Sequence, residues 1–462
     1  MRTIGSDGPS FATADALVSK AKLSGDVGFA VADAKTGIML ETRAETSRAA
    51  PASVTKAITT LYALDVLGPD HRFATQLLRT GPLENGVLKG DLVLAGGGDP
   101  TLGTDDLANL AAALKDTGLR EVRGNFVIFD GALPSAWSID TDQPDHVSYN
   151  PAISGIALNF NRVHFEWKRS SAGFAVTMDA RSERYRPDVA MARMKIADRA
   201  SPVFTYSDGV DRENWTVAKA ALGKGGARWL PVRKPALYAG DVFATMARSH
   251  GIVLKSPTVT SRPVEGAVLA QHFSGSLRSI LEDMLRYSTN ITAEMVGMSA
   301  SARRLGSVPT LRASAAEMNA WAKAELGMQS PALVDHSGLG AANRLSPQDM
   351  VRSLVRAHQT EQLRPILKQI TLRDAKGRPN KGHALTVEAK TGTLNFVSCL
   401  AGYLTVPDGR VLAFAMFTAD ENQRALIPKE DRERPQGARS WNQRSKALQQ
   451  SLLERWGQVY AG

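Results

Sequence analysis

The sequence contains a single cysteine, Cys399, among 462 residues, which excludes an intrachain disulfide and a cysteine-rich metal site. Cys399 lies in the apolar run 397–403, where we expect a buried small hydrophobic side chain. No stretch of about 18 apolar residues occurs, so a membrane-spanning helix is not expected. Met1–Ser10 also lacks the basic-then-apolar layout of a secretory signal. The chain is therefore either cytoplasmic or a mature form whose export segment has been removed.

Three further patterns are missing, and each absence argues against a class of site. The glycine run 96–98 is not followed by Gly-Lys-Ser/Thr, which favours a tight turn before a helix over a phosphate-binding loop. The eight histidines are scattered, with no pair at metal-ligand spacing. No Gly-x-Ser-x-Gly sequence is present, which disfavours an α/β-hydrolase. We therefore expect no metal site.

The charge of the chain is strongly basic, at +10 near neutral pH. A basic surface favours anionic partners such as nucleic acid, acidic lipid or an acidic wall polymer. Lysines and arginines are scattered and are not interleaved with aromatic residues in a stripe, so no nucleic-acid partner is expected. Hydrophobic residues make up 43% of the chain and charged residues 22%, as in ordinary globular proteins.

The pattern of the chain changes twice along its length. Residues 57–67 are apolar on nearly every side, which predicts a helix buried in the centre of a domain. From about 80 to 270, turn-and-strand units alternate with a helical run, and 161–227 alternates polar and apolar residues as strands do. Other expected elements are helices at 12–23, 276–305, 311–326, 347–358 and about 438–457, a strand at 26–32, and a hairpin of 397–406 and 411–418. The last helix is expected to dock on a sheet rather than on a membrane.

Three short motifs point to catalysis: Ser53-Val54-Thr55-Lys56, Ser288-Thr289-Asn290 and Lys390-Thr391-Gly392. On a helix, a serine and a lysine three positions apart share a face, so the Lys56 amine can reach the Ser53 hydroxyl. A lysine acts as a base only when its pKa is depressed, which burial and a second cation such as Lys390 achieve. The helix N-terminus adds positive potential and free N–H groups where an oxyanion develops.

Each motif also recurs elsewhere, at Ser19–Lys22, Ser148–Asn150, Ser440–Asn442 and Lys35–Gly37, so spacing alone does not choose the site. The order of the motifs along the chain and the sequence around each of them do select one site. Ser53 opens the most apolar helical stretch, Ser288 lies amid helical sequence, and Lys390 leads into a strand. These three positions are therefore predicted to form one site.

In the strand that follows Lys390, side chains alternate between two faces, so Gly392 shares a face with Lys390. A glycine there leaves room for the backbone of a substrate. The backbone N–H of Thr393, paired with that of Ser53, is expected to form an oxyanion hole.

At these residues the chain resembles the low-molecular-mass class C penicillin-binding proteins, the D-alanyl-D-alanine carboxypeptidase/endopeptidases of the penicillin-binding protein 4 type. The likeness runs from about residue 12 to the C-terminus. The stretches that carry it besides the motifs are 94–102, 149–161, 288–294, 335–339, 389–394 and 401–403. One departure stands after Ser337-Gly338-Leu339, where the family continues with serine and arginine but Gly340 and Ala341 follow here.

The resemblance implies an α/β multidomain fold: a serine β-lactamase/DD-peptidase-like transpeptidase domain, with an antiparallel sheet flanked by helices, and a large nested insertion forming two smaller domains. The 235 positions between Ser53 and Ser288 agree with such an insertion. The expected limits are 12–79 and 270–458 for the discontinuous DD-peptidase domain, 80–160 and 228–269 for an inserted α/β domain, and 161–227 for a nested mostly-β domain.

The resemblance also implies roles for individual residues. Ser53 is the expected nucleophile and Lys56 its base, while Ser288 passes a proton toward the leaving D-alanine. The remaining expected contacts are Asn290 with the substrate amide, Lys390 and Thr391 with the terminal carboxylate, Gly392 and Thr393 along the substrate backbone, and Asp130 from the insertion toward the active-site lysine. No metal or organic cofactor is implied.

The expected partners are peptidoglycan stem peptides and β-lactam inhibitors, in the periplasm, with peripheral contact to membrane or wall and an oligomeric state that the sequence leaves open, a dimer included. Carboxypeptidase and endopeptidase action are both open. So are two alternatives: a β-lactamase or esterase that turns penicillin over rapidly, and a non-catalytic wall-binding or penicillin-sensing protein. Loss of Lys56 or Lys390 would favour the last, and both are present.

Overall fold

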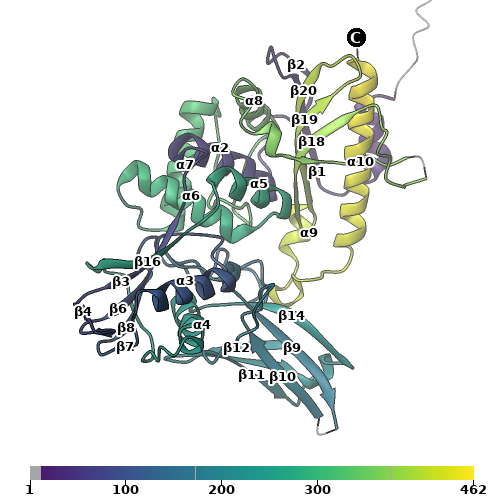
Figure 1. Cartoon of the computed structure of the whole chain (residues 1–462). Helices are drawn as coiled ribbons and strands as arrows, with labels where there is room; N and C mark the ends of the chain where they lie inside the picture. Colours follow the sequence, from purple (N-terminus) through teal and green to yellow (C-terminus); the bar gives the residue numbers. More distant parts are fainter. Residues whose placement is uncertain (1–11, 172, 375, 462) are drawn as a thin grey trace, which may run out of the picture. The chain divides into compact units, whose positions relative to one another are not determined.

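The computed structural model of the chain describes residues 12–171, 173–374 and 376–461 (Figure 1). The prediction for Met1–Ser10 lies outside the described residues. The described chain forms two compact units, one of residues 12–61, 285–288 and 319–461 and the other of residues 62–284 and 289–318. Among the helices described, none is long and apolar enough to cross a membrane.

The first unit is built on an antiparallel sheet in the strand order β17-β18-β19-β20-β1-β2. The hairpin predicted around 407–409 joins two of its central strands. The strands are β1 (Asp26–Asp33), β2 (Met39–Arg43), β17 (Lys368–Gln369), β18 (Thr386–Leu394), β19 (Val397–Thr405) and β20 (Val411–Ala419).

Helices cover both faces of this sheet (Figure 1). Because strand side chains alternate, Leu404 of β19 packs in the core with Trp456 of the C-terminal helix α10, while the Tyr403 hydroxyl donates to the Leu354 carbonyl oxygen of α8, 2.7 Å away. The expected docking of the last helix on a sheet is thus confirmed. The helices are α1 (Ala14–Ala21), α8 (Pro347–His358), α9 (Glu421–Ala425) and α10 (Ala438–Val459), with 3₁₀ turns η4 (Arg364–Ile366) and η5 (Lys429–Asp431).

The second unit contains a mixed sheet in the order β15-β8-β6-β3-β16 and a small sheet β4-β5-β7. Helices α3 and α4 pack together, and their apolar side chains share one core with the larger sheet. The strands are β3 (Ala74–Arg79), β4 (Leu83–Glu84), β5 (Val87–Leu88), β6 (Leu92–Gly96), β7 (Glu121–Val122), β8 (Phe126–Phe129), β15 (Thr258–Thr260) and β16 (Ala267–Phe273), and the helices are α3 (Thr104–Asp116), α4 (Pro235–Ser249) and α6 (Asn290–Leu305). Helices α2 (Thr55–Leu67), α5 (Leu277–Tyr287) and α7 (Leu311–Leu326) each have residues in both units.

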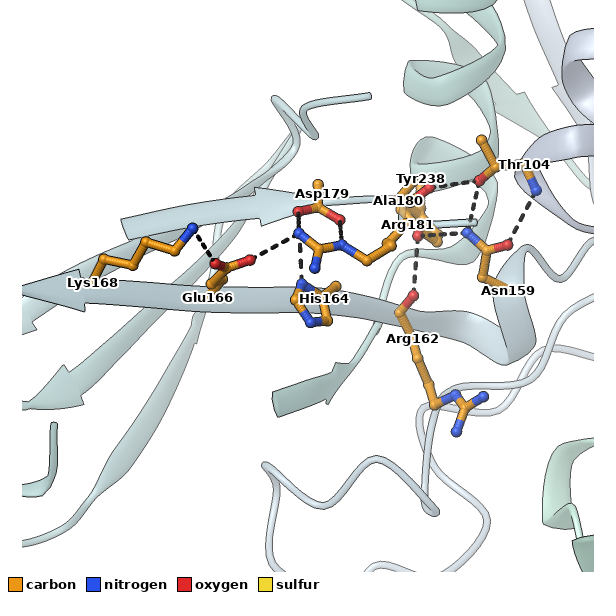
Figure 2. Close-up of polar contacts among 10 residues, drawn as sticks. All are labelled: Thr104, Asn159, Arg162, His164, Glu166, Lys168, Asp179, Ala180, Arg181 and Tyr238. Carbon is orange, nitrogen blue, oxygen red and sulfur yellow. Dashed lines mark hydrogen bonds and ion pairs between the residues drawn. The ribbon is translucent and has the colours of Figure 1, made fainter. Parts of the chain in front are cut away.

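Two three-stranded sheets, β10-β9-β14 and β11-β13-β12, follow within the second unit. An ion-pair row lies along the first of these sheets, where Nη2 of Arg181 donates to the carboxylates of Glu166 and Asp179 at 2.9 and 3.0 Å (Figure 2). The strands are β9 (Arg162–Ser170), β10 (Gly173–Asp179), β11 (Ala192–Ala197), β12 (Phe204–Asp208), β13 (Glu213–Ala218) and β14 (Gly225–Pro231), with 3₁₀ turns η2 (Asn159–Asn161) and η3 (Lys219–Ala221).

Hydrogen bonds tie these strands to helices α3 and α4 (Figure 2). The Thr104 hydroxyl at the start of α3 donates to the Ala180 carbonyl oxygen, 2.9 Å away. The Tyr238 hydroxyl of α4 donates to the Arg162 carbonyl oxygen at 3.0 Å. The Asn159 amide donates to the Thr104 hydroxyl at 2.8 Å. The β-rich segment is therefore anchored by polar contacts as well as by the shared core.

Some predicted boundaries differ from the structure. The continuous helix expected over 276–305 is wrong at one point, because Ser288 has a left-handed φ of +59° between α5 and α6, and such a residue ends a right-handed helix. The expected limits at 80 and 269 also fall beside or inside strands β3 and β16, and the limit at 227 falls inside β14. These limits are placed at turn-rich segments, and the composition of a turn does not indicate which strands pair in one sheet. The division into three domains stays a prediction.

Candidate active site

Ser53 lies in the 3₁₀ turn η1 (Ala52–Val54) that leads directly into α2. The preceding Ala52 has a left-handed φ of +48°, which turns the chain sharply into the helix. The Lys56 amine nitrogen lies 2.9 Å from the Ser53 hydroxyl oxygen. Lys56 is fully buried, whereas Ser53 is partly exposed. A protonated amine donates in this bond, and a neutral amine can accept the hydroxyl proton.

A loop after α7 holds the same amine from another direction. The Lys56 amine donates to the Ser337 carbonyl oxygen at 2.9 Å. One turn further along α2, the Thr59 hydroxyl donates to the His336 carbonyl oxygen at 2.6 Å. The loop therefore fixes both the helix and the amine.

Lys390, on β18, brings the other two motifs together. Its amine donates to the Ser288 hydroxyl oxygen and to the Thr391 carbonyl oxygen, each at 2.9 Å. Burial lowers the pKa of Lys390 well below its ordinary value, and the positive charges of Lys56 and Lys368 lower it further. Two lysine amines in this setting disfavour double protonation, so a neutral amine is available as a base.

Gly392 allows strand β18 to approach the turn that carries Ser53. A Cβ atom built on Gly392 lies 2.8 Å from the Pro51 carbonyl oxygen, 3.0 Å from the Ala52 Cβ atom and 3.1 Å from the Ser53 nitrogen. A side chain at this position would therefore push the turn away. This close approach is a reason for glycine in addition to the room for substrate inferred from the strand.

The side chains of Thr391 and Thr393 are exposed beside the buried Lys390. Exposure leaves both free to meet a ligand from solvent. The substrate contacts predicted for Thr391, Gly392 and Thr393 stay predictions.

Asn290 and Asp130 belong to the second unit. Asn290 is the first residue of α6, and its amide donates to the Tyr149 carbonyl oxygen at 2.9 Å. Asp130 directly follows β8 and lines a cavity of about 370 Å³ together with Trp137 and Arg233. Burial raises the pKa of the Asp130 carboxyl. The roles predicted for both residues stay predictions.

The motifs did not reveal the loop that holds Lys56. Asp335 is buried, with 1% exposure, and its carboxylate accepts the backbone N–H groups of Gly338 and Gly340, each at 2.6 Å. The available signal was an aspartate with glycines three and five positions later, a composition typical of a tight loop. The sequence does not indicate that this loop reaches α2.

Comparison with known proteins places this geometry in context. Residues 12–436 match the D-Ala-D-Ala carboxypeptidase 3 (S13) family. The chain is 30% identical to a D-alanyl-D-alanine carboxypeptidase of an Actinomadura species. The alignment spans 438 residues and covers 87% of this chain and 79% of that protein. It is 24% identical to D-alanyl-D-alanine carboxypeptidase DacB of Haemophilus influenzae, in an alignment of 387 residues that covers 79% of each protein.

The fold matches solved structures as well. Penicillin-binding protein 4 (dacB) of Haemophilus influenzae aligns with a TM-score of 0.75 and 20% identity over 88% of this chain and 93% of that one. The same protein is also known in complex with a β-lactam, at a TM-score of 0.72, 21% identity and the same coverage. The predicted α/β multidomain fold is confirmed, and so is the predicted family of serine-type D-Ala-D-Ala carboxypeptidases. The chain belongs to the D-Ala-D-Ala carboxypeptidase 3 (S13) family.

Proposed function

We propose that the chain hydrolyses D-Ala-D-Ala termini of peptidoglycan stem peptides, D-Ala-meso-diaminopimelate cross-links, or both, through an acyl-enzyme on Ser53. The observation that carries this assignment is the 2.9 Å contact between the Lys56 amine and the Ser53 hydroxyl. A nucleophile hydrogen-bonded to a buried base, which a third group orients, is the arrangement that acyl transfer requires. The Ser337 carbonyl is that third group.

In the acylation step, neutral Lys56 takes the Ser53 proton as Oγ attacks the carbonyl carbon of the penultimate D-alanine. The backbone N–H groups of Ser53 and Thr393 stabilise the oxyanion that forms. The C–N bond then breaks, and the proton that Lys56 took passes through Ser288, whose hydroxyl accepts a hydrogen bond from Lys390, to the leaving amine. The product is an ester on Ser53 and free D-alanine.

In the deacylation step, Lys56 takes a proton from water as the water oxygen attacks the ester carbonyl, and it returns that proton to Ser53 Oγ as the C–O bond to the acyl group breaks. Asn290 holds the substrate amide, and Lys390 with Thr391 holds the terminal carboxylate. A β-lactam reacts in the same way, except that its ring amide opens and the leaving amine stays tethered.

The substrate class supports a periplasmic location, because stem peptides lie outside the cytoplasm. The net charge of +10 supports peripheral contact with an acidic wall or membrane surface. A dimer stays a prediction.

The test is labelling by a fluorescent penicillin, followed by gel detection of the covalent adduct. We expect wild type to be labelled and Ser53→Ala to be unlabelled. Ser19→Ala is the matched control, because Ser19 has the same spacing to Lys22 but lies on the exposed face of α1, and it should label like wild type. An unlabelled wild type, or a labelled Ser53→Ala, would refute the assignment.

Release of D-alanine from a pentapeptide separates the remaining alternatives. A DD-peptidase releases D-alanine and stays acylated by penicillin. A β-lactamase or esterase would turn the penicillin over rapidly, and a penicillin-sensing protein would be labelled without releasing D-alanine or cleaving a D-Ala-meso-diaminopimelate cross-link.

A further inference from the structure

The loop 335–343 contains a buried acidic group for which the mechanism above has no use. Asp335 is 1% exposed, and both of its carboxylate oxygens are engaged. One oxygen accepts the Gly338 N–H at 2.6 Å. The other accepts the Gly340 N–H at 2.6 Å and the Asn343 side-chain amide at 2.9 Å. Since all three partners are donors, the loop is built around an acceptor.

These bonds shape the part of the loop that faces α2. The two residues between Asp335 and Gly338 are the ones whose carbonyl oxygens accept from α2, at Lys56 and Thr59. Gly338 itself has a φ of +79°, and a Cβ atom built on it would lie 1.8 Å from the Ala52 carbonyl oxygen. The loop is therefore pressed against the turn that carries the nucleophile, and the Asp335 carboxylate holds its curvature.

Charge provides a second, independent link between Asp335 and the site. Lys56 and Lys390 are both buried, and their positive charges oppose one another. Burial raises the pKa of the Asp335 carboxyl, while the N–H donors of Gly340, Asn343 and Gly338 and the positive charge of Lys56 stabilise its ionised form. His336, beside it in the loop, adds no charge near neutral pH because burial lowers its pKa to about 3. Lys368 of β17 adds positive charge on the Lys390 side. Asp335 thus offsets one of two buried cations.

We propose that Asp335 is a positioning residue for Lys56: it folds the loop whose Ser337 carbonyl holds the Lys56 amine, and its negative charge sets the balance of protons between the two buried lysines. This proposal rests on the proposed function, in which Lys56 is the base. It differs from a purely structural role because it changes the pH at which the base becomes neutral.

The test is the pH dependence of acylation by a fluorescent penicillin, measured as the second-order rate constant per active site in the full chain. Asp335→Asn removes the charge at nearly constant volume. Without the carboxylate, the Lys56 ammonium is less stable, so the acid limb of the profile should move to lower pH by about one to three units. The plateau should also fall about tenfold or more, because Asn343 and Gly340 then face an amide that cannot accept all their bonds.

Asp349→Asn is the matched control. Asp349 is equally buried in the same unit and also accepts two backbone N–H groups, from Gln329 at 2.8 Å and Ser330 at 3.0 Å. We expect it to lower the melting temperature and leave the midpoint of the pH profile unchanged. An Asp335→Asn profile with the wild-type midpoint would overturn the proposal.

Two more variants separate the possible failures. A Lys56→Met enzyme that acylates at the wild-type rate would refute the proposed base, whereas a slow Lys56→Met with an unshifted Asp335→Asn would refute only the role of Asp335. If Asp335→Asn does not fold, Thr59→Val tests the loop alone, because it removes the bond to the His336 carbonyl and leaves the charge in place. A severalfold lower plateau with an unchanged midpoint is expected, and a wild-type plateau would overturn the positioning role.

Discussion

Replacing Gly392 by alanine tests whether the close approach of β18 to the nucleophile's turn sets the reaction rate. The added Cβ atom would lie 2.8 Å from the Pro51 carbonyl oxygen, whereas ordinary contact begins at 3.4 Å. The difference, 3.4 − 2.8 = 0.6 Å, is the distance by which the turn or the strand must move. The nearest atoms belong to backbone and to the buried Ala52, so no flexible side chain can give way instead.

The expected effect on the rate follows from that displacement. A misplacement of about 1 Å can cost about 100-fold in rate, so a shift of 0.6 Å at Ser53 should slow acylation by about tenfold or more. The cost in stability should be about 1–3 kcal/mol, the usual range for an overpacked position. Rate should therefore fall while the protein remains folded.

The assay is stopped-flow acylation by a fluorescent penicillin, with the free energy of unfolding measured by urea denaturation of the same samples. Gly28→Ala is the control, because Gly28 lies in the same sheet and its added Cβ atom meets neighbours at 3.3 Å, away from Ser53. It should lose a little stability and keep its acylation rate. A Gly392→Ala enzyme that acylates as fast as wild type would refute the reasoning.

Two further predictions concern stability. Burial lowers the pKa of His336 to about 3, whereas a histidine in the unfolded chain has a pKa of about 6.5. Between these two pH values the unfolded state binds a proton that the folded state does not. The free energy of unfolding therefore falls as the pH drops below about 6.5, by at most about 1.4 kcal/mol per pH unit from this residue. In urea denaturation between pH 7.5 and 5, His336→Gln should show a shallower loss than wild type, and equal slopes would contradict this. Gly338→Ala combines a φ of +79° with a Cβ atom 1.8 Å from a carbonyl oxygen, and should lose about 2–6 kcal/mol. Gly409→Ala, with a φ of +88° and open space around it, should lose only the backbone part, so similar losses in both variants would rule out the clash.

The sequence was informative about the site where chemistry fixes local spacing. The Ser53–Lys56 interval places both groups on one helical turn, and the order of the motifs selects Ser288 and Lys390 as their partners. The structure joins these four residues in two hydrogen-bonded pairs, Lys56 with Ser53 and Lys390 with Ser288. Each pair is a short-range consequence of residue type and backbone position.

The loop around Asp335 could not be predicted in the same way. Its contact with Lys56 joins residues 281 positions apart, and no local pattern encodes a carbonyl oxygen as a partner. The break at Ser288 was missed for a different reason. A short left-handed interruption leaves apolar residues on both sides at helical spacing, so 276–305 looks continuous.

The fold class was predictable from the family resemblance, and the sheet faces from period-two alternation. The C-terminal helix was predictable from the 3.6-residue period of its apolar side chains: Trp441, Leu448, Leu452 and Trp456 follow that spacing, and all four are buried. Domain limits were less predictable. Changes in composition mark the turns between elements, but they do not show that a sheet such as β15-β8-β6-β3-β16 combines strands from distant parts of the chain.

The two bonds made by Lys390 have a consequence for substrate binding. A protonated lysine has three N–H donors, and Lys390 already directs two bonds, to Ser288 and to the Thr391 carbonyl oxygen. The protonated form therefore has one N–H donor left for the carboxylate of a stem peptide. Burial lowers the pKa of Lys390, and a bound carboxylate raises that pKa again because it stabilises the protonated amine. Substrate binding would then be accompanied by proton uptake, and its affinity would fall as the pH rises.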